Sequence, residues 1–347
     1  DGNDDSGSSV SSAGDVNGDG FDDLLIGARF ASAEENAKSY AGESYLLFGG
    51  DYTLTVTHLG TGAGEVLNGN GSANVIIGGL GGDTLVGNGG GDVLRGGQGN
   101  DTLAVSDLMF FRLNGGTGVN TLRLDGGDLH LDLTAIADNR IQEIEIIDIS
   151  GSGDNTLTLD WLEVLNLSSQ SNVLTVLRNR GDVVNIGSDW TSAGKIFDGQ
   201  FFDLYTHGAA ILRVQDPTIT VVGNTATIWG TPARDSIVYR IANRQANVNS
   251  VNYVLPSNID LININGLGDK DTLNLIGTPG PESITTGSGM LSVEYNAAHS
   301  GFDVIGQNLE VIILDGQGGG DVVTFNDTTG SDKFFARPTS GFMIDVA

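Results

Sequence analysis

The chain has 347 residues and a formal net charge of −28, from 16 Lys and Arg against 44 Asp and Glu. Such a charge repels nucleic acid and anionic membrane surfaces and attracts cations. No stretch approaches about 18 consecutive apolar residues, so no membrane-spanning helix is predicted. The 53 glycines follow no Gly-X-Y period, which excludes a collagen triple helix, and the absence of cysteine excludes disulfides as the stabilising cross-link.

The first acidic motif, residues 15–23, has the oxygen spacing of the first part of an EF-hand calcium loop. Its side-chain oxygens stand at loop positions 1, 3, 5 and 9, and the residue at position 7 offers a backbone carbonyl. Position 12 holds Ile26 rather than glutamate, and Leu24–Gly27 is typical of a strand, so a helix–loop–helix hand is excluded. The alternative is an acidic hairpin without metal. We predict calcium binding by Asp15, Asn17, Asp19, Phe21 and Asp23.

Residues 13–28, AGDVNGDGFDDLLIGA, followed by residues 42–49, GESYLLFG, resemble an FG-GAP repeat, the blade unit of integrin-α-type propellers. The resemblance implies a propeller-blade-like unit over residues 1–60 whose loop binds calcium between strands. Propellers close with about four to eight blades, and this sequence has one. Three hypotheses stay open: further blades belong to a longer precursor, the blade docks on another molecule, or it caps the rest of the chain.

Four tandem nine-residue units fill residues 69–104. Glycines crowd their first four positions, Asp or Asn is sixth, and a large aliphatic residue is eighth. Glycine lets backbone carbonyls turn inward without a Cβ clash. The strict phase argues against a flexible glycine-rich linker. We predict that two units form one coil of eighteen residues, with an interior stack of Ile76, Leu85, Leu94 and Leu103.

This pattern resembles the calcium-binding nonapeptide of RTX (haemolysin-type) proteins. The resemblance implies a parallel β-roll over residues 61–107, with ions between the turns of successive coils. Asp83 and Asp101 would share one ion; Asn74 and Asp92 would share a weaker one, because asparagine brings no charge. The predicted ligands, through side chain or backbone, are Asn74, Gly78, Leu80, Gly82, Asp83, Gly87, Gly89, Gly91, Asp92, Gly96, Gln98, Asn100 and Asp101.

Past residue 107 the rhythm loosens, and residues 108–217 are predicted to form degenerate solenoid coils. The apolar insert 105–114 is expected to be a strand, and a nonapeptide-like unit restarts at Gly115. A helix is expected only near residues 133–139. Further strands are expected at residues 144–149, 156–160, 163–167, 173–177 and 182–186. The first, third and fifth begin 19 residues apart, which is typical of a two-strand coil that has lost its metal ligands.

Residues 218–347 contain a longer internal repeat of about 50 residues, which predicts wide solenoid coils of several short strands. Ile262–Leu275 recurs at residues 312–325, and Gly230–Ile237 recurs at residues 277–284. Asp271 and Asp321 occupy the place of the nonapeptide aspartates, where they either bind calcium or cap a turn. The last copy is incomplete and uncapped, which suggests head-to-tail completion by another subunit; the alternative is a slice of a larger surface protein.

No catalytic motif emerges from the sequence, so no enzyme is expected. The four histidines, His58, His130, His207 and His299, follow no zinc-binding spacing, and no G-x-S-x-G elbow occurs. Basic residues that would stabilise an enolate are few and scattered. His130 lies in the alternating run 129–133 and is expected to face solvent.

The predicted fold class is all-β: a parallel β-roll or β-solenoid preceded by a single propeller-blade-like unit. The resemblances imply an extracellular, calcium-stabilised structural or adhesive protein of a bacterial cell surface, matrix or fibre. Ca²⁺ is the expected cofactor, because ions would neutralise the acidic turns and couple binding to folding. The expected partners are further copies or other surface-matrix proteins, and a carbohydrate or cell-surface ligand is also open. The alternative function is a calcium-dependent secretion and folding appendage of a secreted protease or polysaccharide lyase.

Overall fold

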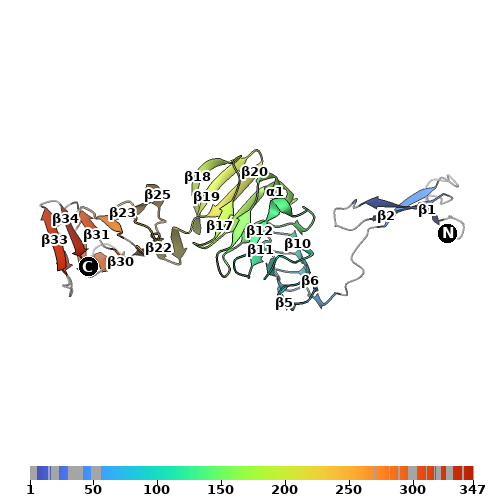
Figure 1. Ribbon diagram of the computed structural model, residues 1–347, viewed down its shortest axis with the longest axis horizontal. Helices are drawn as coiled ribbons and strands as arrows, with labels where there is room; N and C mark the ends of the chain where they lie inside the picture. Colours follow the sequence, from blue (N-terminus) through green and yellow to red (C-terminus); the bar gives the residue numbers. More distant parts are fainter. Residues whose placement is uncertain are drawn as a thin grey trace. The chain divides into compact units, whose positions relative to one another are not determined.

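The computed structural model describes residues 6–14, 16, 23–29, 42–47, 56–268, 270–280, 282–287, 290–295, 303–309, 311–315, 317, 322–325, 331–337 and 340–346. In this part the protein is all-β, apart from one 3-10 turn and one short α-helix (Figure 1). Its contacts divide the chain into unit 1, residues 1–194 and 203–215, and unit 2, residues 195–202 and 216–347. None of the described helices is long and apolar enough to cross a membrane.

The N-terminal part of unit 1 is a three-stranded antiparallel sheet. Ile26 of the central strand pairs with Val10 on one side and with Tyr45 on the other. The sheet order is β1 Ser6–Gly14, β2 Asp23–Ala28, β3 Glu43–Leu47. The strand predicted at residues 24–27 is confirmed by β2, whereas β1 was not predicted.

The nonapeptides form two parallel sheets. In each sheet the neighbouring strand lies 18 residues further along the chain, as the pairs Val75 with Val93 and Thr84 with Thr102 show. This is the step that two nine-residue units predict. The first sheet has the order β13 Ile141–Gln142, β10 Arg112–Thr117, β8 Val93–Gln98, β6 Val75–Leu80, β4 His58–Leu59.

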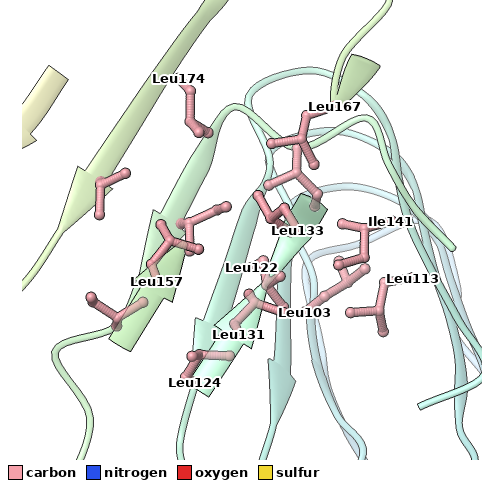
Figure 2. Packing of buried hydrophobic residues seen from close by; sticks show 14 of the residues in the cluster. Leu103, Leu113, Leu122, Leu124, Leu131, Leu133, Ile141, Leu157, Leu167 and Leu174 are labelled. Atoms are coloured by element: carbon pink, nitrogen blue, oxygen red, sulfur yellow. The ribbon is translucent and has the colours of Figure 1, made fainter. Parts of the chain in front are cut away.

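The second sheet carries the longest ladder of buried side chains. Its order is β18 Thr191–Asp198, β19 Gln200–His207, β20 Ala210–Gln215, β16 Val173–Leu177, β14 Ile146–Asp148, β11 Thr121–Leu124, β9 Thr102–Val105, β7 Thr84–Val86, β5 Val66–Asn68. It is parallel from β20 to β5. Leu85, Leu103, Leu122 and Ile147 pair in register and are all fully buried. Leu103 and Leu122 lie side by side in the packed interior (Figure 2).

The interior stack predicted for the nonapeptides is confirmed, since Ile76, Leu85, Leu94 and Leu103 are each fully buried. Burying a leucine side chain stabilises a fold by roughly 1.5–3 kcal/mol. The ladder passes from β9 to β11 without a break, and residues 61–194 and 203–215 all belong to unit 1.

Beyond β11 the step between paired strands widens, which corrects the predicted 19-residue spacing. Ile146 pairs with Thr175, a step of 29, and Thr156 pairs with Val183, a step of 27. The insert at 105–114 is not one strand either, because β10 begins only at Arg112. His130 is exposed, as expected. A third parallel sheet holds the extra strands of the wider coils, β12 His130–Asp132, β15 Thr156–Thr158 and β17 Val183–Asn185.

The predicted strand at 163–167 is wrong, because this segment is the helix α1, Trp161–Asn166. Asp160 caps the helix: its side chain accepts hydrogen bonds from the amides of Leu162 and Glu163. A short run of apolar residues is compatible with a strand or with a short helix. The N-cap Asp160 favours the helix here, because it satisfies two amides of the first turn. The predicted helix near 133–139 is reduced to a 3-10 turn, Leu133–Ala135.

Asp160→Ala is expected to lower the free energy of unfolding by about 1 kcal/mol, because two helix amides lose their acceptor. Urea denaturation of the full chain measures this. The matched control is Asp189→Ala at an exposed site; an equal effect of both substitutions would contradict the capping role.

Unit 2 is built from two mixed sheets. The first sheet has the order β21 Ile219–Val222, β22 Thr225–Trp229, β26 Leu261–Asn265, β30 Asp303–Gln307, β29 Met290–Tyr295, β28 Glu282–Gly287, β32 Val322–Phe325. The second sheet has the order β25 Val251–Val254, β24 Gln245–Val248, β23 Ser236–Arg240, β27 Thr272–Ile276, β31 Val311–Asp315, β34 Ser340–Val346, β33 Ser331–Arg337. Antiparallel hairpins such as β24–β25 and β28–β29 join parallel strand pairs.

The 50-residue sequence repeat of unit 2 is not the spatial step. Ile262 pairs with Val304, a step of 42, and Leu273 pairs with Ile312, a step of 39. Ile262 and Ile312, which correspond in the sequence repeat, therefore lie in different sheets. The inserted hairpins change the coil length from one turn to the next, so residues that correspond in sequence do not stack.

Candidate metal centre

Each nonapeptide turn places a glycine and, five residues later, an acid or amide side chain together. A Cβ atom added to Gly78 would lie 2.5 Å from Oδ2 of Asp83 and 2.6 Å from the carbonyl oxygen of Gly96. Gly96 and Asp101 repeat the arrangement one coil later. Glycine is therefore required at the first position, because two oxygens occupy the space of a side chain.

The acids of one edge form a ladder with the backbone. The amide of Asp83 donates to Oδ1 of Asp101 at 2.8 Å, and the amide of Glu65 donates to Oδ1 of Asp83 at 2.8 Å. Asp83 and Asp101 are both 1% exposed. One oxygen of each carboxylate thus ties its turn to the preceding coil.

The other oxygen of each carboxylate, Oδ2 of Asp83 and of Asp101, is buried and accepts no hydrogen bond. A buried carboxylate without a partner is costly, so it either stays protonated or meets a cation. Burial raises the pKa of Asp101; the amide of Asp83 opposes this rise, and the charge of Asp83 adds to it. This donor-free pair fits a hard cation.

Backbone carbonyls of the following coil lie against the same turn. The carbonyl oxygen of Asn100 would be 2.9 Å from a Cβ at Gly82, and that of Gly96 lies beside Gly78. The carbonyl of Gln98, by contrast, accepts the amide of Gly81 at 2.8 Å. At the Asp83 turn the carbonyls of Gly96 and Asn100 therefore lie against the turn, whereas the carbonyl of Gln98 serves the strand pairing.

No group of three or more Asp, Glu or His side chains that could hold a metal ion gathers within the described residues. Calcium takes about six to eight oxygen ligands. An ion at the Asp83–Asp101 turn would therefore need backbone oxygens for most of its ligands, as the glycine-rich pattern predicts.

The second edge pairs Asn74 with Asp92. The amide of Asn74 donates to Oδ1 of Asp92 at 2.9 Å, but Oδ1 of Asn74 already accepts the amide of Asn70 at 2.7 Å. The Asn74 side chain thus holds its own turn through Oδ1. Burial raises the pKa of Asp92 to about 6. The hydrogen bond from the amide of Asn74 lowers this pKa, and the charge of Asp107 raises it. Asp107, which also accepts the amide of Gly90 at 3.2 Å, was missed in the sequence.

The acid ladder is longer than the sequence predicted. Residues 60–68 are a further unit, with Glu65 sixth and Leu67 eighth, and the spaced glycines at 60, 62 and 64 were its signal. In this unit the amide of Thr61 donates to Oε2 of Glu65 at 2.6 Å. At the other end, Asn120 accepts the amide of Asp101 at 3.0 Å and Glu145 accepts that of Asn120 at 2.7 Å. Glu145 has no signal in the sequence, because the spacing between paired strands changes before it.

The N-terminal calcium loop is described only in part. Asp15, Asn17, Asp19 and Phe21 lie outside the described residues. Asp23 is fully buried at the start of β2, and its Oδ2 accepts the amide of Val16 at 2.7 Å. Asp321 also lies outside the described residues, as does His299.

In a chelator, the free energy of unfolding is expected to fall as the pH rises from about 4 to about 6. The folded-state pKa of Asp92, about 6, exceeds its ordinary value of 3.8, so the folded chain binds more protons in this window. Glu163 acts with the same sign up to about pH 7, because burial and the charges of Asp138, Asp160 and Asp132 raise its pKa to about 7. Urea denaturation at several pH values measures the slope.

Asp92→Asn is the matched variant for this pH dependence, since it keeps the acceptor for the Asn74 amide and removes the titrating group. It should make the curve less steep between about pH 4 and 6 and leave the part due to Glu163. A slope that is unchanged in this variant would contradict the assignment to Asp92.

Residues 6–47 match the family model of the FG-GAP repeat. This span contains the antiparallel sheet β1–β3 and ends before the nonapeptides. Comparison with curated proteins and with solved structures gave no match.

Proposed function

We propose that the chain is part of an extracellular structural or adhesive protein whose residues 61–107, in unit 1, form a calcium-stabilised β-roll of the RTX type. The observation that carries the proposal is the donor-free pair of buried carboxylate oxygens on Asp83 and Asp101. Parallel strands at 18-residue steps and the glycine–acid turns support the β-roll.

The extracellular part of the proposal has separate support. FG-GAP repeats occur in extracellular and surface proteins, and residues 6–47 match one. The chain has no cysteine and a net charge of −28, so a bound cation would replace disulfides as the cross-link. Calcium outside cells is abundant enough to fill weak sites.

The proposed mechanism is calcium-coupled folding. A bound ion would supply the positive charge that the buried carboxylates lack. The chain's own part is to hold two coils in register, through the amide of Asp83 on Asp101 and the amide of Glu65 on Asp83. Binding free energy then becomes folding free energy, about 2.7 kcal/mol at a calcium concentration 100 times the dissociation constant.

Thermal unfolding of the full chain, followed by circular dichroism, tests the proposal in calcium, in magnesium and in EGTA at equal ionic strength. The melting temperature should rise with calcium, and less with magnesium, which demands a smaller and more regular ligand shell. The double variant Asp83→Asn/Asp101→Asn should lose the rise. Equal melting temperatures in all three buffers would defeat the proposal. Electron microscopy of the calcium-loaded protein tests the fibre-forming part separately.

A further inference from the structure

Asn120 continues the ladder of Asp83 and Asp101 one coil further along the chain. It is the sixth residue of its nine-residue unit, as Asp101 is of its own. In each turn a glycine lies four residues earlier, and these two glycines, Gly97 and Gly116, pair in register with φ angles of 116° and 86°. Oδ1 of Asn120 accepts the amide of Asp101 at 3.0 Å, as Oδ1 of Asp101 accepts the amide of Asp83 at 2.8 Å. The turns therefore share one backbone shape and one ladder contact.

The side-chain nitrogen of Asn120 faces two backbone carbonyls. Nδ2 donates to the carbonyl oxygen of Gly116 at 3.2 Å and to that of Glu143 at 3.1 Å. The orientation of the amide group is fixed, because carbonyls only accept hydrogen bonds and the Asp101 amide, which faces Oδ1, only donates. Asn120 is fully buried, and both polar atoms of its side chain have partners.

The Asp101 turn has the same surroundings without this nitrogen. A Cβ added to Gly96 would overlap the carbonyl oxygen of Gly115, as a Cβ added to Gly115 would overlap that of Glu143. The Cβ at Gly96 would also overlap Oδ2 of Asp101, which is buried and accepts no hydrogen bond. An ionised carboxylate cannot donate to a carbonyl, whereas a cation binds oxygens of both kinds. The N–H groups of Asn120 thus supply the positive partner that the Asp101 turn lacks.

The acids at the two ends of this edge have donors within the chain. Glu145 accepts the amide of Asn120 at 2.7 Å through Oε2 and the hydroxyl of Ser168 at 2.5 Å through Oε1. At the other end, Glu65 accepts the amide and the hydroxyl of Thr61 at 2.6 and 2.8 Å. In the described part of this edge, the donor-free carboxylate oxygens therefore belong to the two turns between these ends.

An asparagine bridges two coils in the same way beside the third parallel sheet. Asn155 is fully buried; its Oδ1 accepts the amide of Leu129 at 2.8 Å, and its Nδ2 donates to the carbonyl of Ile149 at 2.9 Å. Its own amide donates to Oδ1 of Asp182 at 2.8 Å, and Oδ2 of Asp182 accepts the amide of Asn179 at 2.7 Å. Bridging by a side-chain amide is thus a repeated device of this chain.

We propose that Asn120 ends the row of cation sites in the β-roll, because its side-chain nitrogen takes the place that a cation takes beside Asp83 and Asp101. The proposal rests on the proposed function of residues 61–107 and adds which residue stops the row. A carboxylate at position 120 would keep the ladder contact and leave the carbonyls of Gly116 and Glu143 without a donor. Asn120→Asp should therefore extend the row by one ion.

Native mass spectrometry of the full chain, titrated with calcium, counts the bound ions. Asn120→Asp should bind one calcium ion more per chain than the parent. Asn172→Asp adds the same charge at an exposed position of unit 1 and should bind the same number of ions as the parent.

Hydrogen–deuterium exchange of the same variants separates ligand binding from folding. In EGTA, peptides from β8 and β10 should exchange about tenfold faster in Asn120→Asp than in the parent, because two hydrogen bonds are lost. Calcium should bring this exchange to within about twofold of the parent. Asn120→Ala loses the same hydrogen bonds and offers no ligand, so calcium should not restore its protection.

The outcomes distinguish the proposal from the function on which it rests. If the parent binds calcium and Asn120→Asp binds no more ions, the proposal fails and the proposed function stands. Exchange in Asn120→Asp that calcium leaves as fast as in Asn120→Ala also overturns the proposal, since Asn120 then has a structural role alone. If the parent binds no calcium, the proposed function fails, and the proposal fails with it.

Discussion

Asp101→Asn is expected to lower the stability of the chain in calcium and to leave it unchanged or raise it in EGTA. Asparagine has the size of aspartate and keeps Oδ1 as the acceptor for the Asp83 amide. It removes only the charge and the donor-free oxygen Oδ2. The same substitution should therefore act with opposite signs in the two buffers.

In calcium the variant loses a charged ligand. A 100-fold weaker site at a calcium concentration 100 times the parent dissociation constant loses most of the 2.7 kcal/mol of stabilisation, about 2 kcal/mol. In EGTA no cation balances the buried carboxylate of Asp101, and burial raises the pKa of this group. The variant avoids the cost of burying a charge, because asparagine is neutral. Urea denaturation in both buffers measures the two differences.

Asp189→Asn makes the same change of charge at an exposed position and is the matched control. Its effect should stay within about 0.5 kcal/mol in either buffer. A loss of stability of Asp101→Asn that is equal in calcium and in EGTA would show that the carboxylate has a structural role alone.

Gly97→Ala is expected to lower the free energy of unfolding by about 3–5 kcal/mol in calcium and in EGTA alike. Gly97 has a φ of 116°, a conformation that costs an L-residue about 1–3 kcal/mol. An alanine Cβ would also overlap the carbonyl oxygen of Gly79 in the preceding coil. That oxygen belongs to the backbone, so relief requires the two coils to move apart.

Gly71→Ala is the matched control within the same repeats. Its added Cβ would find its nearest neighbour, the carbonyl oxygen of Asn88, at 3.9 Å, which is ordinary contact. Its cost should stay within about 0.5–1 kcal/mol. Equal costs for Gly71→Ala and Gly97→Ala in urea denaturation would contradict the close stacking of the turns.

The two predictions separate the two properties of the nonapeptide turn. The glycine substitution tests packing and acts with or without an ion, whereas the aspartate substitution tests charge and reverses sign with the ion. A calcium response that survives Gly97→Ala but not Asp101→Asn would assign binding to the carboxylate rather than to the overall shape of the coil.

The sequence alone determined the local geometry of residues 69–104. A strict nine-residue phase, with glycine at its start and a leucine or isoleucine eighth, leaves one way to bury the aliphatic residues, and it sets the 18-residue step between Val75 and Val93. The pairing of Asp83 with Asp101 follows from the same step. Because the units repeat, the same nine-residue pattern sets both the local turn and the contact between strands 18 residues apart.

Outside these repeats only the tertiary structure decided the arrangement. Inserted residues lengthen the step between paired strands while the strand ladder stays intact. The spacing of the apolar residues therefore did not predict the step from Ile146 to Thr175. It also did not predict the helix α1, which replaced a predicted strand. The donor that satisfies Asp235 comes from Asn249, on a hairpin that no repeat announces. A periodic sequence specifies what stacks on its own equivalent, but whether a buried carboxylate meets a neighbouring donor or is left for a cation depends on segments that lie outside the period.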